Sequence, residues 1–159
     1  MNWWKSLQSK VRLARQLSPG EWLTLAEAWW LLIVFSLALR WQSFEHLKES
    51  FRLSGRKKVD PPGVLGFAQR LENLIYLAAR LHLFPMPCLT RACTLHWMLG
   101  RNGIPSRLCI GANKSLGRFS AHAWVVVAGQ AIGEPEDISD TFKTLSSSAE
   151  KEPPELQYS

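Results

Sequence analysis

The 159-residue sequence predicts one domain of the α+β class, in which helices come first and a small antiparallel sheet follows. Up to about residue 100, apolar side chains recur every three or four positions, as they do on one face of a helix. Between residues 106 and 132 the pattern changes to short runs rich in β-branched and aromatic residues around a glycine turn. Because 47% of the residues are hydrophobic, the composition excludes a mostly disordered chain.

The first helix is expected to begin near residue 18, where Ser18 and Glu21 have the spacing of a capping box. The apolar stretch that follows, residues 22–39, approaches membrane-spanning length. Glu27 interrupts it, however, and the clean run covers only residues 28–39. We therefore expect a buried helix, with a membrane-peripheral helix and a true span as the alternatives.

A charged segment rich in Pro and Gly, residues 55–63, is typical of a connector. It divides the chain into an N-terminal helical segment at residues 1–60 and a core at residues 61–142. The residues after Phe142 lack apolar periodicity, so an acidic flexible tail is expected at residues 143–159.

Two helices and two strands are expected within the core. The helices cover residues 64–83 and 88–99, and the prolines between them separate one from the other. The strands cover residues 106–111 and 121–127, with residues 112–120 as a polar loop. Gly129 then marks a tight turn into residues 130–132, which pair with the second strand.

The net charge of +6 is unevenly distributed. Residues 61–133 carry seven Lys and Arg against one acid, whereas residues 134–159 carry two against seven acids. A basic body suits an anionic partner such as an acidic peptide. Nucleic acid is not expected as a partner, because the sequence has no zinc finger and no RNP-type aromatic motif.

The three cysteines, Cys88, Cys93 and Cys109, form neither a CxxC pair nor a four-ligand metal pattern, and an odd number is a poor disulfide framework. The first twenty residues are polar and basic without the apolar core of a signal peptide. We therefore expect a cytoplasmic protein without metal or organic cofactor. Cys93 and Cys109 are expected to be core residues.

Cys88 is the candidate nucleophile. It follows Pro87 at the start of an expected helix, where unpaired backbone N–H groups and the helix dipole favour a thiolate. His122, in an expected strand, would exchange a proton with that sulfur. A carboxylate just after the hairpin turn would orient the imidazole, and three candidates follow the turn: Glu134, Glu136 and Asp137.

The length of the hairpin loop decides which acid shares the face of His122, because facing residues lie on one side of a sheet. With a three-residue loop, residues 128–130, Glu136 lies opposite His122 and Glu134 lies diagonally beside it. With a two-residue loop, Asp137 shares the face of His122 and Glu134 turns away. The sequence leaves both open.

Two neighbours of these residues have open roles. Trp124 alternates with His122, and we expect it in the core beneath the site rather than in a wall of the substrate cleft. Arg91, three residues after Cys88, is placed either to stabilise the thiolate or to pair with an acid.

Three motifs carry a family resemblance. They are Cys-Leu-Thr-Arg at residues 88–91, Arg-Asn-Gly-Ile-Pro-Ser-Arg-Leu at 101–108 and His-Ala-Trp-Val at 122–125. In order and spacing they resemble the transglutaminase-like leader peptidase of lasso-peptide biosynthesis, the C-terminal half of the lasso B protein. The resemblance covers about residues 87–142 and implies a transglutaminase- or papain-like cysteine peptidase core, with the cysteine helix packed on a small antiparallel sheet.

The resemblance also implies a catalytic triad. The family's Cys and His match Cys88 and His122, and its Asp falls at Glu134, so that Asp has become Glu. The expected reaction is removal of the leader from a lasso precursor through an acyl-enzyme, with the Cys88 backbone N–H as a candidate oxyanion donor.

The chain has no room for a leader-binding domain, so the resemblance implies the split form of the protein. The expected partners are the lasso precursor with its leader and core, a separate leader-recognition protein and an ATP-dependent lasso cyclase. Two alternatives remain. One is a transglutaminase-like acyltransferase, and the other is a non-catalytic, membrane-peripheral interaction protein.

Overall fold

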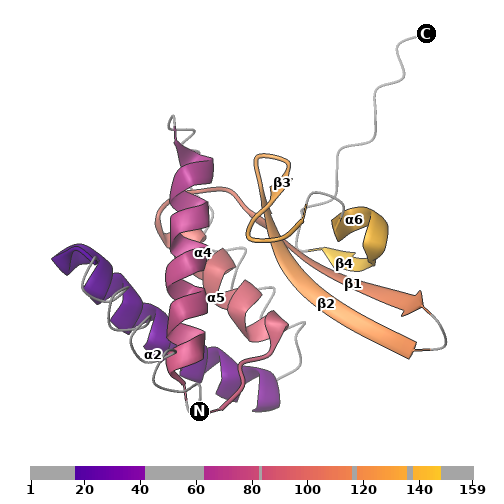
Figure 1. The fold of residues 1–159 in the computed structure, drawn as a ribbon, viewed down its shortest axis with the longest axis horizontal. Coiled ribbons are helices and arrows are strands. Elements are labelled where there is room, and N and C mark those ends of the chain that lie inside the picture. Colours follow the sequence, from indigo (N-terminus) through magenta and orange to yellow (C-terminus); the bar gives the residue numbers. More distant parts are fainter. Residues whose placement is uncertain (1–16, 42–62, 83, 116–117, 136–137, 148–159) are drawn as a thin grey trace, which may run out of the picture.

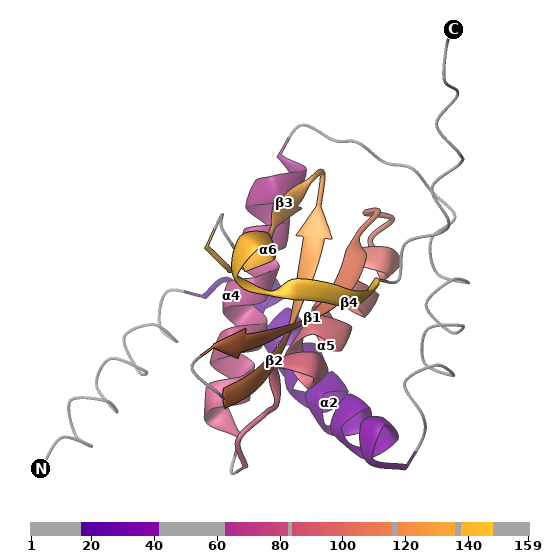
Figure 2. The same ribbon diagram turned by 90° about the vertical axis from the view of Figure 1, so that its right-hand side faces the viewer.

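The computed structural model describes residues 17–41, 63–82, 84–115, 118–135 and 138–147 (Figure 1). Among these described residues, three helices precede the sheet, which confirms the predicted α+β class. They form three layers, with α2 on one side of α4 and α5 and the sheet on the other side (Figures 1 and 2). The helices are α2 (Pro19–Trp41), α4 (Val64–Leu81) and α5 (Cys88–Arg101), and a short α6 (Ile138–Thr141) follows the hairpin.

Helix α2 begins with the expected capping box. The backbone N–H of Ser18 donates to the Glu21 carboxylate at 2.8 Å, and the N–H of Glu21 donates to the Ser18 hydroxyl at 3.3 Å. The expectation of a buried helix is wrong for much of its surface. Leu25, Ala28, Leu32 and Phe35 enter the core, but the opposite side of the helix is exposed and apolar.

The expected boundary at residue 60 lies outside the described residues. The buried stripe of α2 joins one core cluster with side chains of α4, α5 and β2, so the helix belongs to the same body as the rest. The expected connector at residues 55–63 lies outside the described residues except for Gly63.

The sheet has four antiparallel strands in the order β3-β2-β1-β4. They are β1 (Arg107–Ser115), β2 (Arg118–Val127), β3 (Gln130–Ala131) and β4 (Lys143–Ser147). The expected polar loop at residues 112–120 is wrong, because the β1–β2 ladder continues to the pair Ser115 and Arg118. Backbone hydrogen bonds carry this extension, and they need no apolar side chains.

The beginning of the expected tail is also part of the sheet. Lys143 pairs with Ala112, and Ser147 pairs with Cys109, so β4 covers the free edge of β1. Its polar sequence gave no sign of this, because pairing at an edge rests on the backbone. The remaining tail, residues 148–159, lies outside the described residues.

The β2–β3 hairpin has a two-residue loop, since Val127 pairs with Gln130. The loop residues Ala128 and Gly129 both have positive φ angles, 48° and 82°, as a type I′ turn requires. The three-residue loop that would place Glu136 opposite His122 is therefore wrong.

Candidate active site

Cys88 is the first residue of α5. Pro87 precedes the helix with φ −59° and ψ 151°, and its carbonyl accepts the first helical hydrogen bond, from the Arg91 N–H, at 3.2 Å. The backbone N–H of Cys88 thus precedes the first intrahelical bond and has no acceptor within the helix. The Cys88 side chain is half-buried, whereas Cys93 and Cys109 are 0% and 5% exposed and pack in the core as expected.

His122 lies on β2, directly opposite Gly111 of β1. Its ring stacks on Trp124, with centroids 6.3 Å apart, and lies 5.5 Å from the ring of Phe142. A Cβ atom at Gly111 would come within 2.9 Å of both Trp124 and Phe142. Gly111 therefore leaves the space that these two aromatic rings fill beside the imidazole.

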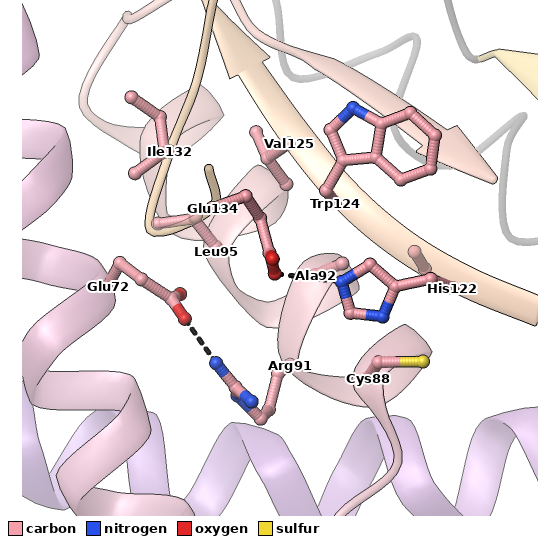
Figure 3. A pocket seen from close by; sticks show the side chains of 11 residues that line it. Glu72, Cys88, Arg91, Ala92, Leu95, His122, Trp124, Val125, Ile132 and Glu134 are labelled. Atoms are coloured by element: carbon pink, nitrogen blue, oxygen red, sulfur yellow. Dashed lines mark hydrogen bonds and ion pairs between the residues drawn. The ribbon is translucent and has the colours of Figure 1, made fainter. Parts of the chain in front are cut away.

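Glu134 holds the imidazole. Its Oε1 lies 2.8 Å from Nε2 of His122, and both side chains are about three-quarters buried. Since Nε2 is engaged by the carboxylate, Nδ1 is the nitrogen that remains for exchange with a thiol. Figure 3 shows the imidazole beside Cys88 in one pocket, with Glu134 on the far side of the ring.

The position of Glu134 contradicts the strand-parity argument, which turned this residue away from His122 for a two-residue loop. The argument assumed that the second strand continues, but β3 ends at Ala131. Beyond it, Gly133 has φ 73° and redirects the chain before Glu134. Parity holds only while a strand lasts. The other two acidic candidates, Glu136 and Asp137, lie outside the described residues.

Helix α4 supports this redirected segment. The N–H of Gly133 donates to Oε1 of Gln69 at 3.3 Å. A Cβ at Gly133 would lie 2.8 Å from Cγ of Glu72, so the Glu72 side chain packs directly against this glycine. Contacts with α4, rather than strand pairing, therefore hold the residue that precedes Glu134.

A buried ion pair lines the same pocket as Cys88, His122 and Glu134. Glu72 of α4 is 8% exposed, and its Oε1 lies 2.5 Å from a terminal nitrogen of Arg91 on α5. Burial raises the pKa of the Glu72 carboxyl, and the Arg91 cation opposes that rise. The Arg91 guanidinium also lies over the Tyr76 ring, 5.0 Å from its centroid.

The sequence analysis did not identify Glu72 as a candidate site residue. One signal was present, because Glu72 is the single acid among the 73 residues 61–133. Of the two roles considered for Arg91, the structure shows the pairing with an acid. Trp124 is 2% exposed and packs in a small core cluster with Cys109 and Ile138, and it also lines the pocket.

The fold and the pocket together define a class of protein. It is an α+β domain in which a helix carries a cysteine, and a strand and the segment after the hairpin carry a histidine and a carboxylate that line the same pocket. Consistent with this class, residues 29–147 match the transglutaminase-like superfamily, and the chain belongs to that superfamily. The superfamily includes cysteine peptidases and acyltransferases, and its fold is usually catalytic. No curated protein and no solved structure matches the chain at a significant level.

Proposed function

We propose that the protein is a cysteine peptidase that removes the leader peptide from a lasso-peptide precursor. The observation that carries the proposal is the contact between Nε2 of His122 and Glu134 in the pocket that Cys88 also lines. It leaves Nδ1 as the proton-exchanging nitrogen on the cysteine side of the ring.

In the first half of the proposed reaction, Nδ1 of His122 accepts the Cys88 proton as Sγ attacks the carbonyl carbon at the leader–core junction. The Cys88 backbone N–H, which has no helical acceptor, donates to the resulting oxyanion. The C–N bond then breaks, and Nδ1 returns its proton to the leaving amine of the core. The leader remains attached to Sγ as a thioester.

In the second half, Nδ1 accepts a proton from a water molecule whose oxygen attacks the thioester carbon. The C–S bond breaks, the proton passes back to sulfur, and the leader leaves as a carboxylic acid. Throughout, Glu134 holds the ring orientation and stabilises the imidazolium that forms twice in the cycle. The proposal requires no metal or organic cofactor.

The assignment to lasso precursors rests on the three sequence motifs, two of which supply residues that line the pocket. The first forms the initial turn of α5, and the third lies on β2 with His122. The second joins α5 to β1, with Ile104 and Leu108 buried in the core. We propose a separate leader-recognition protein and an ATP-dependent cyclase as partners, acting together in the cytoplasm.

The test incubates the full chain with a lasso precursor and the recognition protein, and identifies the products by mass spectrometry. A peptidase yields the leader acid and a core with a free amine. An acyltransferase yields a leader joined to an added amine, which would contradict the proposal. Cys88→Ala should abolish cleavage with an unchanged melting temperature, whereas Cys93→Ala, which removes a thiol from the same helix, should retain cleavage.

A further inference from the structure

Helix α2 presents a continuous apolar stripe away from the core. The stripe residues are separated by seven, four, three and four positions, which keeps them on one side of a helix with 3.6 residues per turn. Four of them are more than half exposed, and Trp41 is 84% exposed. We define the outer stripe as Leu23, Trp30, Val34, Leu37 and Trp41.

The other side of α2 packs in the core of the protein. Leu25, Ala28, Leu32 and Phe35 are at most 7% exposed and pack against α4 and α5. By length and composition α2 could cross a membrane. A helix packed in this way, however, cannot be surrounded by lipid on all sides, so only its outer half is available to a partner.

By helical spacing Glu27 falls between Leu23 and Trp30, on the side of the outer stripe, but both acids of α2 are paired with cations. Glu21 accepts a hydrogen bond from Nε of Arg70 on α4 at 2.6 Å, and Glu27 pairs with Arg101 on α5. Both carboxylates are therefore neutralised by cations of the helical layer beneath α2. Glu27, expected to break the apolar run, is held by Arg101 and does not add an unpaired charge to the stripe.

The sequence on both sides of α2 is basic. Residues 1–16 carry four Lys and Arg and no acid, and residues 42–62 carry five against three acids. In the sequence, these charges flank the stripe on both sides. A second copy of the chain docked there would bring like charges together, whereas an anionic lipid surface would attract them.

We propose that α2 lies in the plane of an anionic bilayer and inserts its outer stripe into the interfacial region. Aromatic and aliphatic side chains with neighbouring cations are the features by which interfacial helices bind such surfaces. Strand β2, which carries His122, lies on the side of the α4 and α5 layer opposite α2 (Figure 1), so this docking does not cover that side of the molecule. The proposal does not depend on the proposed peptidase activity.

The test measures co-sedimentation of the full chain with vesicles of pure phosphatidylcholine or of phosphatidylcholine mixed with phosphatidylglycerol. We expect binding to the mixed vesicles. Trp30→Glu and Leu37→Glu should each weaken this binding by about tenfold or more. Each change removes an apolar side chain that the bilayer would bury, and adds a negative charge that the anionic lipid repels. Gln130→Glu adds the same charge at the exposed β2–β3 turn and should bind as the parent does.

Three results would overturn the proposal. If the parent and both stripe variants bind the mixed vesicles equally, the affinity for these vesicles comes from the basic segments at residues 1–16 and 42–62 alone. A parent that binds neither vesicle but forms a dimer in sedimentation velocity, broken by Leu37→Glu, would assign the stripe to a second copy. A monomeric parent that binds neither vesicle would leave the stripe to a protein partner. Unchanged melting temperatures of the variants show that folding does not cause the loss.

Discussion

Cys88 differs from the other two cysteines in what surrounds its sulfur. It is half-buried at the first residue of α5, whereas Cys93 is enclosed by the core, and burial raises the pKa of Cys93 to about 12. Cys109 is 5% exposed. Only the first of the three is therefore placed to react with a small reagent while the protein is folded.

Brief treatment of the native protein with iodoacetamide at pH of about 8 should add one label, on Cys88. The same treatment in denaturant should add labels to all three cysteines. Intact-mass and peptide mass spectrometry measure both outcomes. Rapid labelling of Cys93 in the native protein would contradict the enclosure described for this thiol.

Substitution of each acid after the hairpin tests which one orients His122. Glu134→Ala should lower kcat for precursor cleavage by about a hundredfold or more, because the ring loses its acceptor. Glu134→Gln should retain part of the activity, since an amide oxygen still accepts from Nε2–H. Glu136→Ala and Asp137→Ala are the matched controls, and a larger loss in either one would assign the role there instead.

Comparison of substitutions at Gly133 and Gly129 distinguishes the effect of backbone strain from the effect of displacing Glu134. Both have positive φ angles, but a Cβ at Gly133 meets Glu72 at 2.8 Å, whereas one at Gly129 meets nothing within 4 Å. Each change to Ala should cost about 1–2 kcal/mol in unfolding free energy from strain. Only Gly133→Ala should also lower the rate of precursor cleavage, because it moves Glu134. Equal rates in the two variants would contradict the support by α4.

At the scale of elements, α5 is tied to the start of the sheet through His96. Its Nδ1 lies 2.7 Å from the Ser106 hydroxyl, just before β1. His96 is largely enclosed, and burial lowers its pKa from 6.5 to about 4. The folded protein thus binds this proton less readily than the unfolded chain does.

This difference predicts a loss of stability in mild acid. The contribution of neutral His96 is fully present above pH 6.5 and falls as the pH drops to about 4, by up to about 3 kcal/mol. Urea unfolding at several pH values measures it. His96→Gln should flatten the dependence in this window, and an equally steep loss in that variant would assign it to another group.

How well each helix or strand could be predicted from the sequence depended on whether side chains or backbone hydrogen bonds stabilise it. Helices α4 and α5 were predicted within two residues at each end, because an apolar face and prolines mark them in the sequence. β4 and the outer halves of β1 and β2 were missed, since backbone pairing leaves no apolar alternation to detect. Cys88 and His122 were identified from local chemistry, whereas the supporting contacts of Gln69 and Glu72 join segments about sixty residues apart.

At the scale of the whole molecule, α2 completes the core and at the same time carries an apolar outer surface. Two leucines of this helix differ in that respect, because Leu32 is 0% exposed and Leu37 is 55% exposed.

Leu32→Ala should lower the free energy of unfolding by about 2–5 kcal/mol, because it leaves a cavity between α2 and the layer beneath it. Leu37→Ala should change it by less than about 0.5 kcal/mol, as an exposed substitution does. Urea denaturation measures both. Similar values for the two variants would mean that α2 does not contribute to the common core.

The carboxylate of Glu134 reaches His122 from a connecting segment that α4 supports. The imidazole of His122, in contrast, is positioned by strand β2. The two halves of this pair are thus built independently. Changes at the α4 residues that hold Gly133 would move the acid, while the pairing of β2 with β1 continues to hold the imidazole. Such construction lets either partner be remodelled, in evolution or by design, while the other stays where it is.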